Sequence, residues 1–279
     1  SDHECVSAAE SMEKLSQVMY IMIREGTGAK NLDDLLPIVN EKTAGRIMWC
    51  TDDRHPQDLL AEGSIDYIIK KAVNQGLDPV TAIRMATLHP AAYFGLHWLG
   101  AIAPGRRADL VVVPDLERFE VSSVYCAGEL AAENGVSVFV DPGTGLDEYP
   151  ASMHLGRQPL DFSIPARGSR IRVIGTVPGQ IITINSVMEA RIRDGCAVSD
   201  PDRDLIKLAV VERHMGTGNV GLGFISGFGL KIGAVAGSVA HDFHNIIAAG
   251  VSDEDIRAAV EAVVQMGGGL AVCAQKTLQ

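Results

Sequence analysis

The stretch from Ile47 to Pro56 constrains the fold of this chain more than any other part of the sequence. Four apolar residues, Ile47 to Cys50, are followed almost at once by Asp52 and Asp53. An apolar run of this length is typical of a buried parallel strand. Carboxylates at the carboxyl end of such a strand lie where barrel enzymes keep their chemistry, and because they are costly to desolvate they usually hold a metal, another cation or a proton. The alternative is a helix cap, since Asp is common before a helix.

Composition and charge exclude several classes of function. The 279 residues are 47% hydrophobic and 21% charged, which is ordinary for globular chains of about two domains. The net charge of -11 argues against a nucleic-acid partner, because binding a phosphate backbone needs clustered Lys and Arg. No apolar run has membrane-spanning length, and five scattered cysteines without a CxxC pair favour a reducing compartment, so we expect a cytoplasmic protein.

Helical and strand patterns alternate in the first fifty residues. A capping box at residues 7–10 opens a helical pattern, and the apolar run Tyr20–Ile23 ends at Arg24. Another helical pattern runs from Asn31 to Gly45 and leads into the strand at Ile47–Cys50. Helix and strand joined by short connections predict a parallel α/β unit.

The pattern changes near residue 100 to turn chemistry and short strands, with a hairpin expected at Gly128. Residues 141–168 hold several prolines and little periodicity, which indicates a linker or an irregular crossing segment. A second α/β region is expected from about residue 170. In it, residues 216–237 are Gly-dense and predict short strands and turns, and a capping box at Ser252 predicts a helix.

Three groups of polar residues are candidates for chemistry. Asp52 is the best of them, because a carboxylate beside a divalent ion can both bind it and move a proton. Asp53 is expected to pair with Arg54 or to orient its neighbour. His3, if it ends a strand, is a good neutral metal ligand, although a surface histidine at a frayed terminus is the alternative.

The third candidate is the polar cluster that contains His241 and His244. It fits a ligand-contacting loop, a second metal site or a hydrogen-bonded structural network. Gly216–Gly221 resembles a dinucleotide fingerprint only superficially, and GxSxG, P-loop and HExxH motifs are absent. The base deaminases that use His-x-Glu with Pro-Cys-x-x-Cys are excluded because neither motif is present.

Several longer segments carry a resemblance to known proteins. Three consecutive segments resemble the amidohydrolase superfamily, where they follow the last barrel strand: residues 82–96, 100–105 and 108–112. Four others are similar to the metal-dependent bacterial adenine deaminase family within it: residues 1–4, 19–26, 50–56 and 238–247. The resemblance covers nearly the whole chain and is weakest over residues 141–168.

The resemblance implies an α/β protein in four parts. Residues 1–98 would be the last strands and helices of a (β/α)8 metal-dependent hydrolase barrel, and residues 99–140 a segment of a small β domain. Residues 141–168 would be a linker, and residues 169–279 a C-terminal α/β domain. The chain opens without an initiator Met, so we interpret it as a piece of a longer polypeptide whose N-terminal part is missing.

The resemblance also implies a binuclear metal site. His3 would match the sixth-strand histidine ligand, and Asp52 would match the eighth-strand aspartate that is both metal ligand and proton shuttle. The remaining ligands would lie upstream, so we expect this piece to be inactive alone. Manganese or iron is the implied metal, with zinc as the alternative.

The implied reaction is hydrolytic deamination of adenine to hypoxanthine and ammonia, in which metal-activated hydroxide attacks C6 of the purine. Arg24, Glu25 and Asp53 would contact this small-molecule substrate, and His241 and His244 would reach the same pocket. We expect a homo-oligomer. Two alternatives stay open: another purine or cyclic-amide hydrolase of the superfamily, since fold does not fix substrate, and a non-catalytic fragment that binds a partner.

Overall fold

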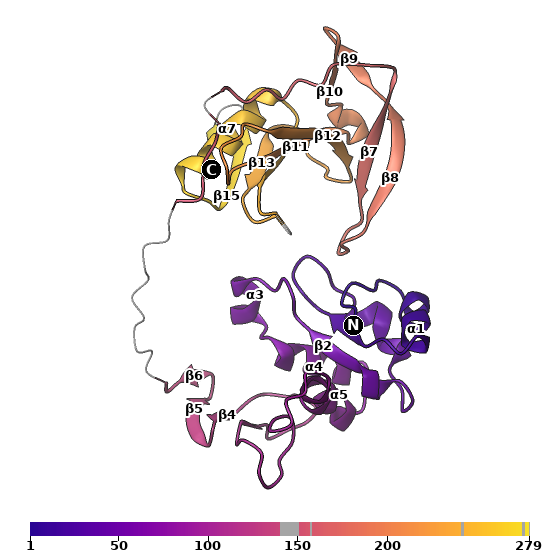
Figure 1. Cartoon of the computed structure of the whole chain (residues 1–279), viewed down its shortest axis with the longest axis vertical. Coiled ribbons are helices and arrows are strands. Elements are labelled where there is room, and N and C mark those ends of the chain that lie inside the picture. The colour runs from indigo at the N-terminus through magenta and orange to yellow at the C-terminus, as the bar shows by residue number, and fades with distance from the viewer. Residues whose placement is uncertain (140–150, 157, 241–242, 275–276, 279) are drawn as a thin grey trace. The chain divides into compact units, whose positions relative to one another are not determined.

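The computed structural model describes residues 1–139, 151–156, 158–240, 243–274 and 277–278. The chain divides into two compact units (Figure 1). Unit 1 is Ser1–Thr144 with Gly179–Ile181, and unit 2 is Gly145–Pro178 with Ile182–Gln279. None of the described helices is long and apolar enough to cross a membrane.

Unit 1 is built on a short parallel sheet. Strands β1 (Ile21–Arg24) and β2 (Ile47–Cys50) pair in parallel, with Ile21 opposite Ile47 and Arg24 opposite Cys50. Asp2 extends the sheet on the other side of β1, because its N–H donates to Tyr20 O at 2.9 Å and its carbonyl accepts from Met22 N at 2.8 Å. Three parallel segments therefore end at one edge, as the alternating pattern predicts.

Helices pack on this sheet, and two of them begin at a side-chain cap. Ser7 Oγ accepts from Glu10 N at 3.3 Å, and Asp78 accepts from Thr81 N at 2.8 Å, so both residues cap helices. The helices of unit 1 are α1 (Ala8–Ser16), α2 (Leu32–Leu35), α3 (Pro56–Ala61), α4 (Ile65–Asn74), α5 (Pro79–Ala86) and α6 (Leu88–Tyr93), with 3-10 turns η1 (Leu36–Ile38) and η2 (Ala44–Arg46).

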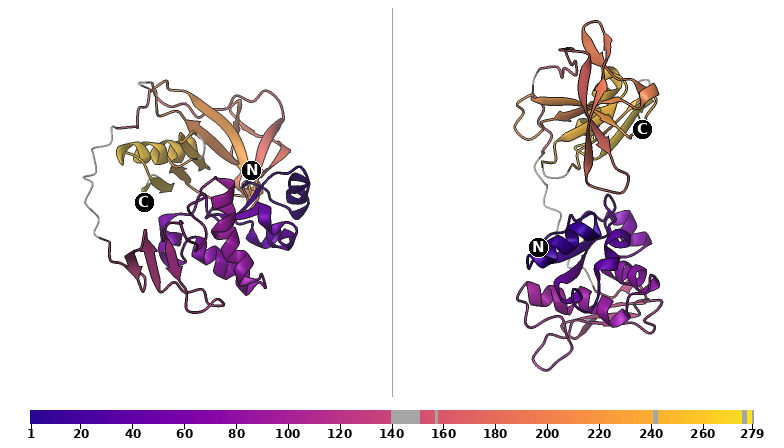
Figure 2. Two further views of the ribbon diagram at one scale, coloured as in Figure 1. Left: turned by 60° about the horizontal axis from the view of Figure 1, so that its bottom comes forward. Right: turned by 90° about the vertical axis from the view of Figure 1, so that its right-hand side faces the viewer.

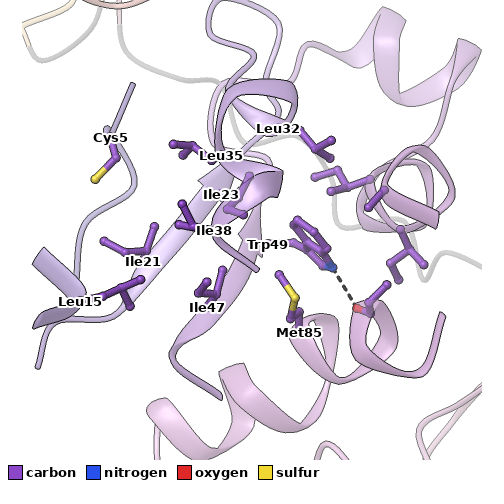
Figure 3. Packing of buried hydrophobic residues seen from close by; sticks show 14 of the residues in the cluster. Cys5, Leu15, Ile21, Ile23, Leu32, Leu35, Ile38, Ile47, Trp49 and Met85 are labelled. Atoms are coloured by element: carbon purple, nitrogen blue, oxygen red, sulfur yellow. Dashed lines mark hydrogen bonds between the residues drawn. The ribbon is translucent and has the colours of Figure 1, made fainter. Parts of the chain in front are cut away.

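One face of the β1–β2 pair makes the core of unit 1. Alternate residues Ile21 and Ile23 of β1 and Ile47 and Trp49 of β2 are buried against the helices, and Trp49 Nε1 donates to Ala82 O at 2.9 Å (Figure 3). Residues in between, such as Arg24, therefore face the other way. This alternation decides which strand side chains lie on the face opposite the helices.

A small antiparallel sheet follows in unit 1. Its strands are β3 (Leu110–Val112), β4 (Ser123–Cys126), β5 (Glu129–Glu133) and β6 (Val136–Ser137), in that spatial order. Ala127 and Gly128 both have positive φ, 53° and 88°, which is the geometry of a tight hairpin turn. The hairpin predicted at Gly128 is confirmed.

Unit 2 contains an eight-stranded mixed sheet, in the order β16-β15-β13-β14-β11-β12-β7-β8. Its strands are β7 (Arg170–Thr176), β8 (Thr183–Glu189), β11 (Ile206–Val211), β12 (Val220–Ser226), β13 (Ala234–Gly237), β14 (Ile246–Gly250), β15 (Leu270–Ala274) and β16 (Thr277–Leu278). Unit 2 also contains a separate two-stranded hairpin, β9 (Arg191–Arg193) with β10 (Cys196–Val198), and the 3-10 turn η3 (Pro201–Arg203).

The helix α7 (Asp253–Gln265) packs against β13, β14 and β15 (Figure 2). The sequence predicts an α/β region here, but α7 is the one α-helix among the described residues of unit 2, and the described strands pair antiparallel except for β7 with β12. Strands β7 and β8, β11 and β12, and β13 and β14 are neighbours both in the chain and in the sheet, which favours antiparallel pairing, whereas α7 connects β14 to β15 across β13.

Part of the predicted linker belongs to the core of unit 2. Phe162 lies within residues 141–168 but is 1% exposed and packs with α7 residues such as Ile256. His154 N also donates to Arg213 O at 2.7 Å. Residues 151–156 and 158–168 are therefore packed structure, while residues 141–150 lie outside the described residues.

Candidate functional site

Four ionisable side chains meet at the carboxyl edge of the parallel sheet in unit 1. His3 directly follows the Asp2 segment, Arg24 ends β1, and Asp52 and Asp53 come just after β2. Parallel strands deliver the residues that follow them to one edge, which is why residues 50 positions apart in the chain come together.

Asp52 has a left-handed backbone conformation that shapes this cluster. Its φ is 49°, a region that Asp tolerates better than most residues. In a continuing strand, Asp52 and Asp53 would point to opposite faces. The left-handed residue breaks this alternation, and both carboxylates reach the guanidinium of Arg24.

The distances within the cluster are short. Asp52 Oδ2 lies 3.1 Å from His3 Nε2 and 3.3 Å from Arg24 Nη1. Arg24 Nη2 lies 3.2 Å from Asp53 Oδ1. The side chain of Arg24 is 5% exposed, whereas those of Asp52 and His3 are 20% and 47% exposed, so the cluster opens on the side of His3.

Asp53 is seated in a loop of small residues. Gly28 N donates to Asp53 Oδ2 at 2.8 Å, and a Cβ on Gly26 would stand 1.7 Å from Asp53 Oδ1. Burial alone raises the pKa of Asp53, but the Gly28 N–H group and the Arg24 guanidinium lower it more, to below its usual value. The expected pairing of Asp53 with Arg54 is wrong, because Arg54 instead donates to Gly63 O at 2.7 Å and pairs with Glu62.

The structure places Glu25 away from this cluster. Its side chain is fully buried on the helical side of the sheet, where Oε1 accepts from Lys71 Nζ at 2.8 Å and Oε2 from Leu32 N at 3.3 Å. Burial lowers the pKa of Lys71, but its bonds to Glu25 and Asp33 raise it more. A direct contact of Glu25 with substrate, as the sequence suggested, does not fit this arrangement.

The predicted histidines of the third candidate belong to unit 2. His244 has a left-handed φ of 45°, and its carbonyl accepts from Arg213 Nε at 2.6 Å. His241 lies outside the described residues. A role for either histidine at a purine pocket therefore stays a prediction.

The pair His3 and Asp52 fits two positions on one divalent cation. Zinc and similar ions bind imidazole nitrogen and carboxylate oxygen at about 2.0–2.2 Å, which places adjacent ligand atoms about 3 Å apart. The observed separation of 3.1 Å agrees with this. No group of three or more His, Cys, Asp or Glu side chains suited to a metal occurs among the described residues, so these two make only part of a site.

The glycine loop is a feature that reasoning from sequence missed. Gly26 and Gly28 come directly after β1 and leave room for the Asp53 carboxylate. A Gly-x-Gly pair directly after a strand was the available signal, because it marks a close approach of another group to the backbone.

Comparisons with known proteins give matches to two families. Residues 6–131 match the amidohydrolase family and residues 180–279 match the adenine deaminase C-terminal domain. The chain is 53% identical over 274 residues to the adenine deaminase of Desulfatibacillum aliphaticivorans, covering 98% of this chain and 48% of that protein. It is 49% identical to adenine deaminase 2 of Carboxydothermus hydrogenoformans and 44% identical to the adenine deaminase of Dehalococcoides mccartyi, again over 98% of this chain and 48% of each relative.

The chain thus spans about half the length of the curated relatives it matches. The two family matches fall on different units: the first covers the parallel sheet and most of the small β-sheet of unit 1, and the second covers most of the mixed sheet of unit 2. The chain therefore belongs to the amidohydrolase family through residues 6–131 and to the adenine deaminase C-terminal domain family through residues 180–279.

Proposed function

We propose that the whole protein, of which this chain is a part, hydrolyses adenine to hypoxanthine and ammonia. The observation that carries the proposal is the pair His3 and Asp52, whose ligand atoms lie 3.1 Å apart at the carboxyl edge of a parallel sheet. This is the edge at which barrel enzymes hold their catalytic groups. The similarity to proteins named adenine deaminase supports adenine as the substrate.

In this proposal the parallel sheet is the last part of a (β/α)8 barrel, and the remaining metal ligands come from the half of the relatives' length that this chain does not match. His3 Nε2 and Asp52 Oδ2 would hold one divalent cation of a binuclear site. When bound, such a cation supplies Lewis acidity that brings the pKa of water to about 7. The imidazole and carboxylate donors suit manganese or iron, with zinc as the alternative.

Asp52 moves the proton in the proposed reaction. The water oxygen bonds to C6 of adenine, and the bond from C6 to the exocyclic amine breaks. Asp52 accepts the proton that water loses and delivers it to the departing amine, which leaves as ammonia. Its oxygen Oδ1 has no partner among the described residues, whereas Oδ2 faces His3 and Arg24, so one oxygen is available for this proton.

The proposal includes a place in purine metabolism, a cytoplasmic location and a homo-oligomeric state. The protein is expected to act on a free purine base, since the net charge of -11 disfavours a polyanionic partner.

The test is ammonia release by the full-length polypeptide loaded with Mn²⁺. We expect ammonia from adenine and none from guanine, and no ring opening of dihydroorotate or other cyclic amides in the same panel. Removal of the metal with a chelator should abolish release, and added Mn²⁺ should restore it. Ammonia from guanine, or ring opening of a cyclic amide, with no ammonia from adenine, would overturn the assignment while keeping the family.

A further inference from the structure

Arg24 is one of the few charged side chains that unit 1 buries. The residue is 4% exposed, and its guanidinium lies against two carboxylates, Nη1 at 3.3 Å from Asp52 Oδ2 and Nη2 at 3.2 Å from Asp53 Oδ1. A planar guanidinium can engage two acceptors at fixed positions, which a lysine ammonium cannot do. The burial also means that the side chain is not available to a substrate.

The remaining nitrogen of the Arg24 guanidinium, Nε, does not help to fix the direction of the side chain. Its Nε is buried and has no hydrogen-bond partner among the described residues. Arg54 pairs with a carboxylate too, that of Glu62, but its Nε also donates to Gly63 O at 2.7 Å and its guanidinium lies 4.4 Å from the centre of the Tyr67 ring. Among the described residues, the groups that orient the guanidinium of Arg24 are therefore the carboxylates of Asp52 and Asp53.

Asp53 is the fixed end of this arrangement. Gly28 N holds its Oδ2 at 2.8 Å, and the absence of side chains on Gly26 and Gly28 lets the carboxylate sit against the loop. Its side chain is 11% exposed. One oxygen of Asp53 accepts from the loop, and the other is buried 3.2 Å from Arg24 Nη2, where the described residues give it no hydrogen bond.

We propose that Arg24 is a positioning residue that holds the Asp52 carboxylate in place, and that Asp53 and the Gly26–Gly28 loop hold Arg24. The loop fixes Asp53, Asp53 fixes the guanidinium, and the guanidinium fixes Asp52 Oδ2 within 3.1 Å of His3 Nε2. This replaces the expected roles of Arg24 and Asp53 as contacts to the substrate. It rests on the proposed function, which gives Asp52 its task.

Such a series of positioning contacts predicts a distinct pattern of kinetic constants in variants. Groups that orient a metal ligand typically change metal affinity or turnover by about 10- to 100-fold when they are replaced. They leave ground-state binding of the substrate almost unchanged, so kcat falls while KM stays. Because Arg24 and Asp53 act in series, the loss of both is expected to cost no more than the loss of either.

The experiment compares Arg24→Lys, Asp53→Asn and the double variant in the full-length protein. Each is expected to lower kcat for adenine by about 10- to 100-fold with KM within about 2-fold of the wild type, and the double variant is expected to match the singles. Arg84→Lys is the matched control, since Arg84 is exposed on α5 and outside the cluster, and it should be unchanged.

A second readout does not depend on turnover. Co²⁺ is titrated into the metal-free full-length protein and followed by its visible absorption, and both single variants should bind it about 10-fold more weakly than the wild type and the Arg84→Lys control. Asp53→Asn keeps the size of the side chain, so it serves even if Arg24→Lys does not fold.

Three outcomes overturn the inference. A KM raised 10-fold or more at unchanged kcat would show that Arg24 or Asp53 contacts the substrate. Additive losses in the double variant would show that the two act separately, and Co²⁺ affinities equal to the control would show that neither positions Asp52. If wild-type protein releases no ammonia from adenine but the variants still weaken Co²⁺ binding, the proposed function fails and the positioning role stands.

Discussion

Two buried arginines, one in each unit, are held in opposite ways. Arg24 in unit 1 lies between the carboxylates of Asp52 and Asp53. Arg213 in unit 2 is 9% exposed and donates to neutral oxygens instead, to His244 O at 2.6 Å and to Ser152 O and Oγ at 2.8 Å each. No carboxylate in the described part of the chain lies within ion-pair distance of Arg213.

The difference separates a functional arrangement from a structural one. Arg213 ties residues 152, 213 and 244 together through backbone oxygens, so its task is complete once the loops are closed. Arg24 fixes charges that remain partly exposed beside His3, an arrangement that adds little to stability because two buried ions cost desolvation. Substitutions near Arg24 should therefore affect activity, and substitutions near Arg213 should affect stability.

The largest effect is expected from Asp52→Asn. The amide keeps the shape but can neither accept the proton nor serve as an anionic ligand, so kcat for adenine in the full-length protein should fall by about 10³-fold or more. The free energy of unfolding should change by no more than about 1 kcal/mol, because the side chain is partly exposed. Ammonia release and denaturant unfolding check the two parts.

The matched control is Asp33→Asn, which removes an exposed carboxylate of the same unit. It should leave kcat unchanged. Retained activity in Asp52→Asn would end the functional reading of the unit 1 cluster.

Arg213→Met is expected to show the opposite pattern. It leaves the carbonyl groups of Ser152 and His244 without their donor, which should lower the free energy of unfolding by about 2–4 kcal/mol. Below the melting temperature, kcat should stay within about 3-fold of the wild type. Arg203→Met removes an exposed ion pair with Asp200 and should cost less than about 1 kcal/mol. If Arg213→Met lost turnover at unchanged stability, the structural role assigned to Arg213 would be wrong.

Some of this comparison was predictable from the sequence and some was not. Strand Ile47–Cys50 is confirmed residue for residue, because an uninterrupted apolar run that ends at two carboxylates is a local signal. The resemblance implied that His3 and Asp52 share a metal site, and the structure gives the reason for their proximity: parallel strands end at one edge, and each residue directly follows a segment of the sheet. These parts of the site needed no knowledge of side-chain direction.

The unpredicted parts depend on side-chain direction and on distant partners. Arg24 and Glu25 are neighbours in sequence, yet one faces Asp52 and the other Lys71, and only the alternation of β1 decides which. Asp53 pairs with Arg24 rather than Arg54 because the left-handed Asp52 re-aims it. In unit 2, the Gly-dense residues 216–237 do hold short strands, but their periodicity does not say that β12 lies beside β7.

The comparison is sharpened by substituting glycines that differ in what surrounds them. In Gly26→Ala, the new Cβ would stand 1.7 Å from Asp53 Oδ1 and 2.9 Å from Thr51 O, so Asp53 must move and Arg24 loses its support. We expect kcat to fall by about 10-fold. A Cβ at Gly45, which precedes the amino end of β2, would meet nothing within 4 Å, so Gly45→Ala should leave kcat unchanged. Equal kcat values for the two variants would show that the position of the Asp53 carboxylate against the loop does not affect turnover.

The smallest expected effect concerns Glu212, next to Arg213, and appears only in acid. Its carboxylate accepts from Met215 N at 2.7 Å and Thr217 N at 2.9 Å, and these bonds lower the pKa of Glu212 from 4.5 to about 2. Because the pKa is lower in the folded state, the stabilisation is complete above pH 4.5 and is lost as the pH falls towards about 2.

Glu212→Gln should therefore melt below the wild type at pH 7, with the gap closing between pH 4.5 and about 2, whereas exposed Glu117→Gln should show no gap at any pH. Melting curves across this range check both. A gap that persists at pH 2 would mean that the loop beside Arg213 is held by shape rather than by the charge of Glu212. In that case the contrast between the units would rest on Arg213 alone, because its bonds to Ser152 and His244 do not titrate in this range.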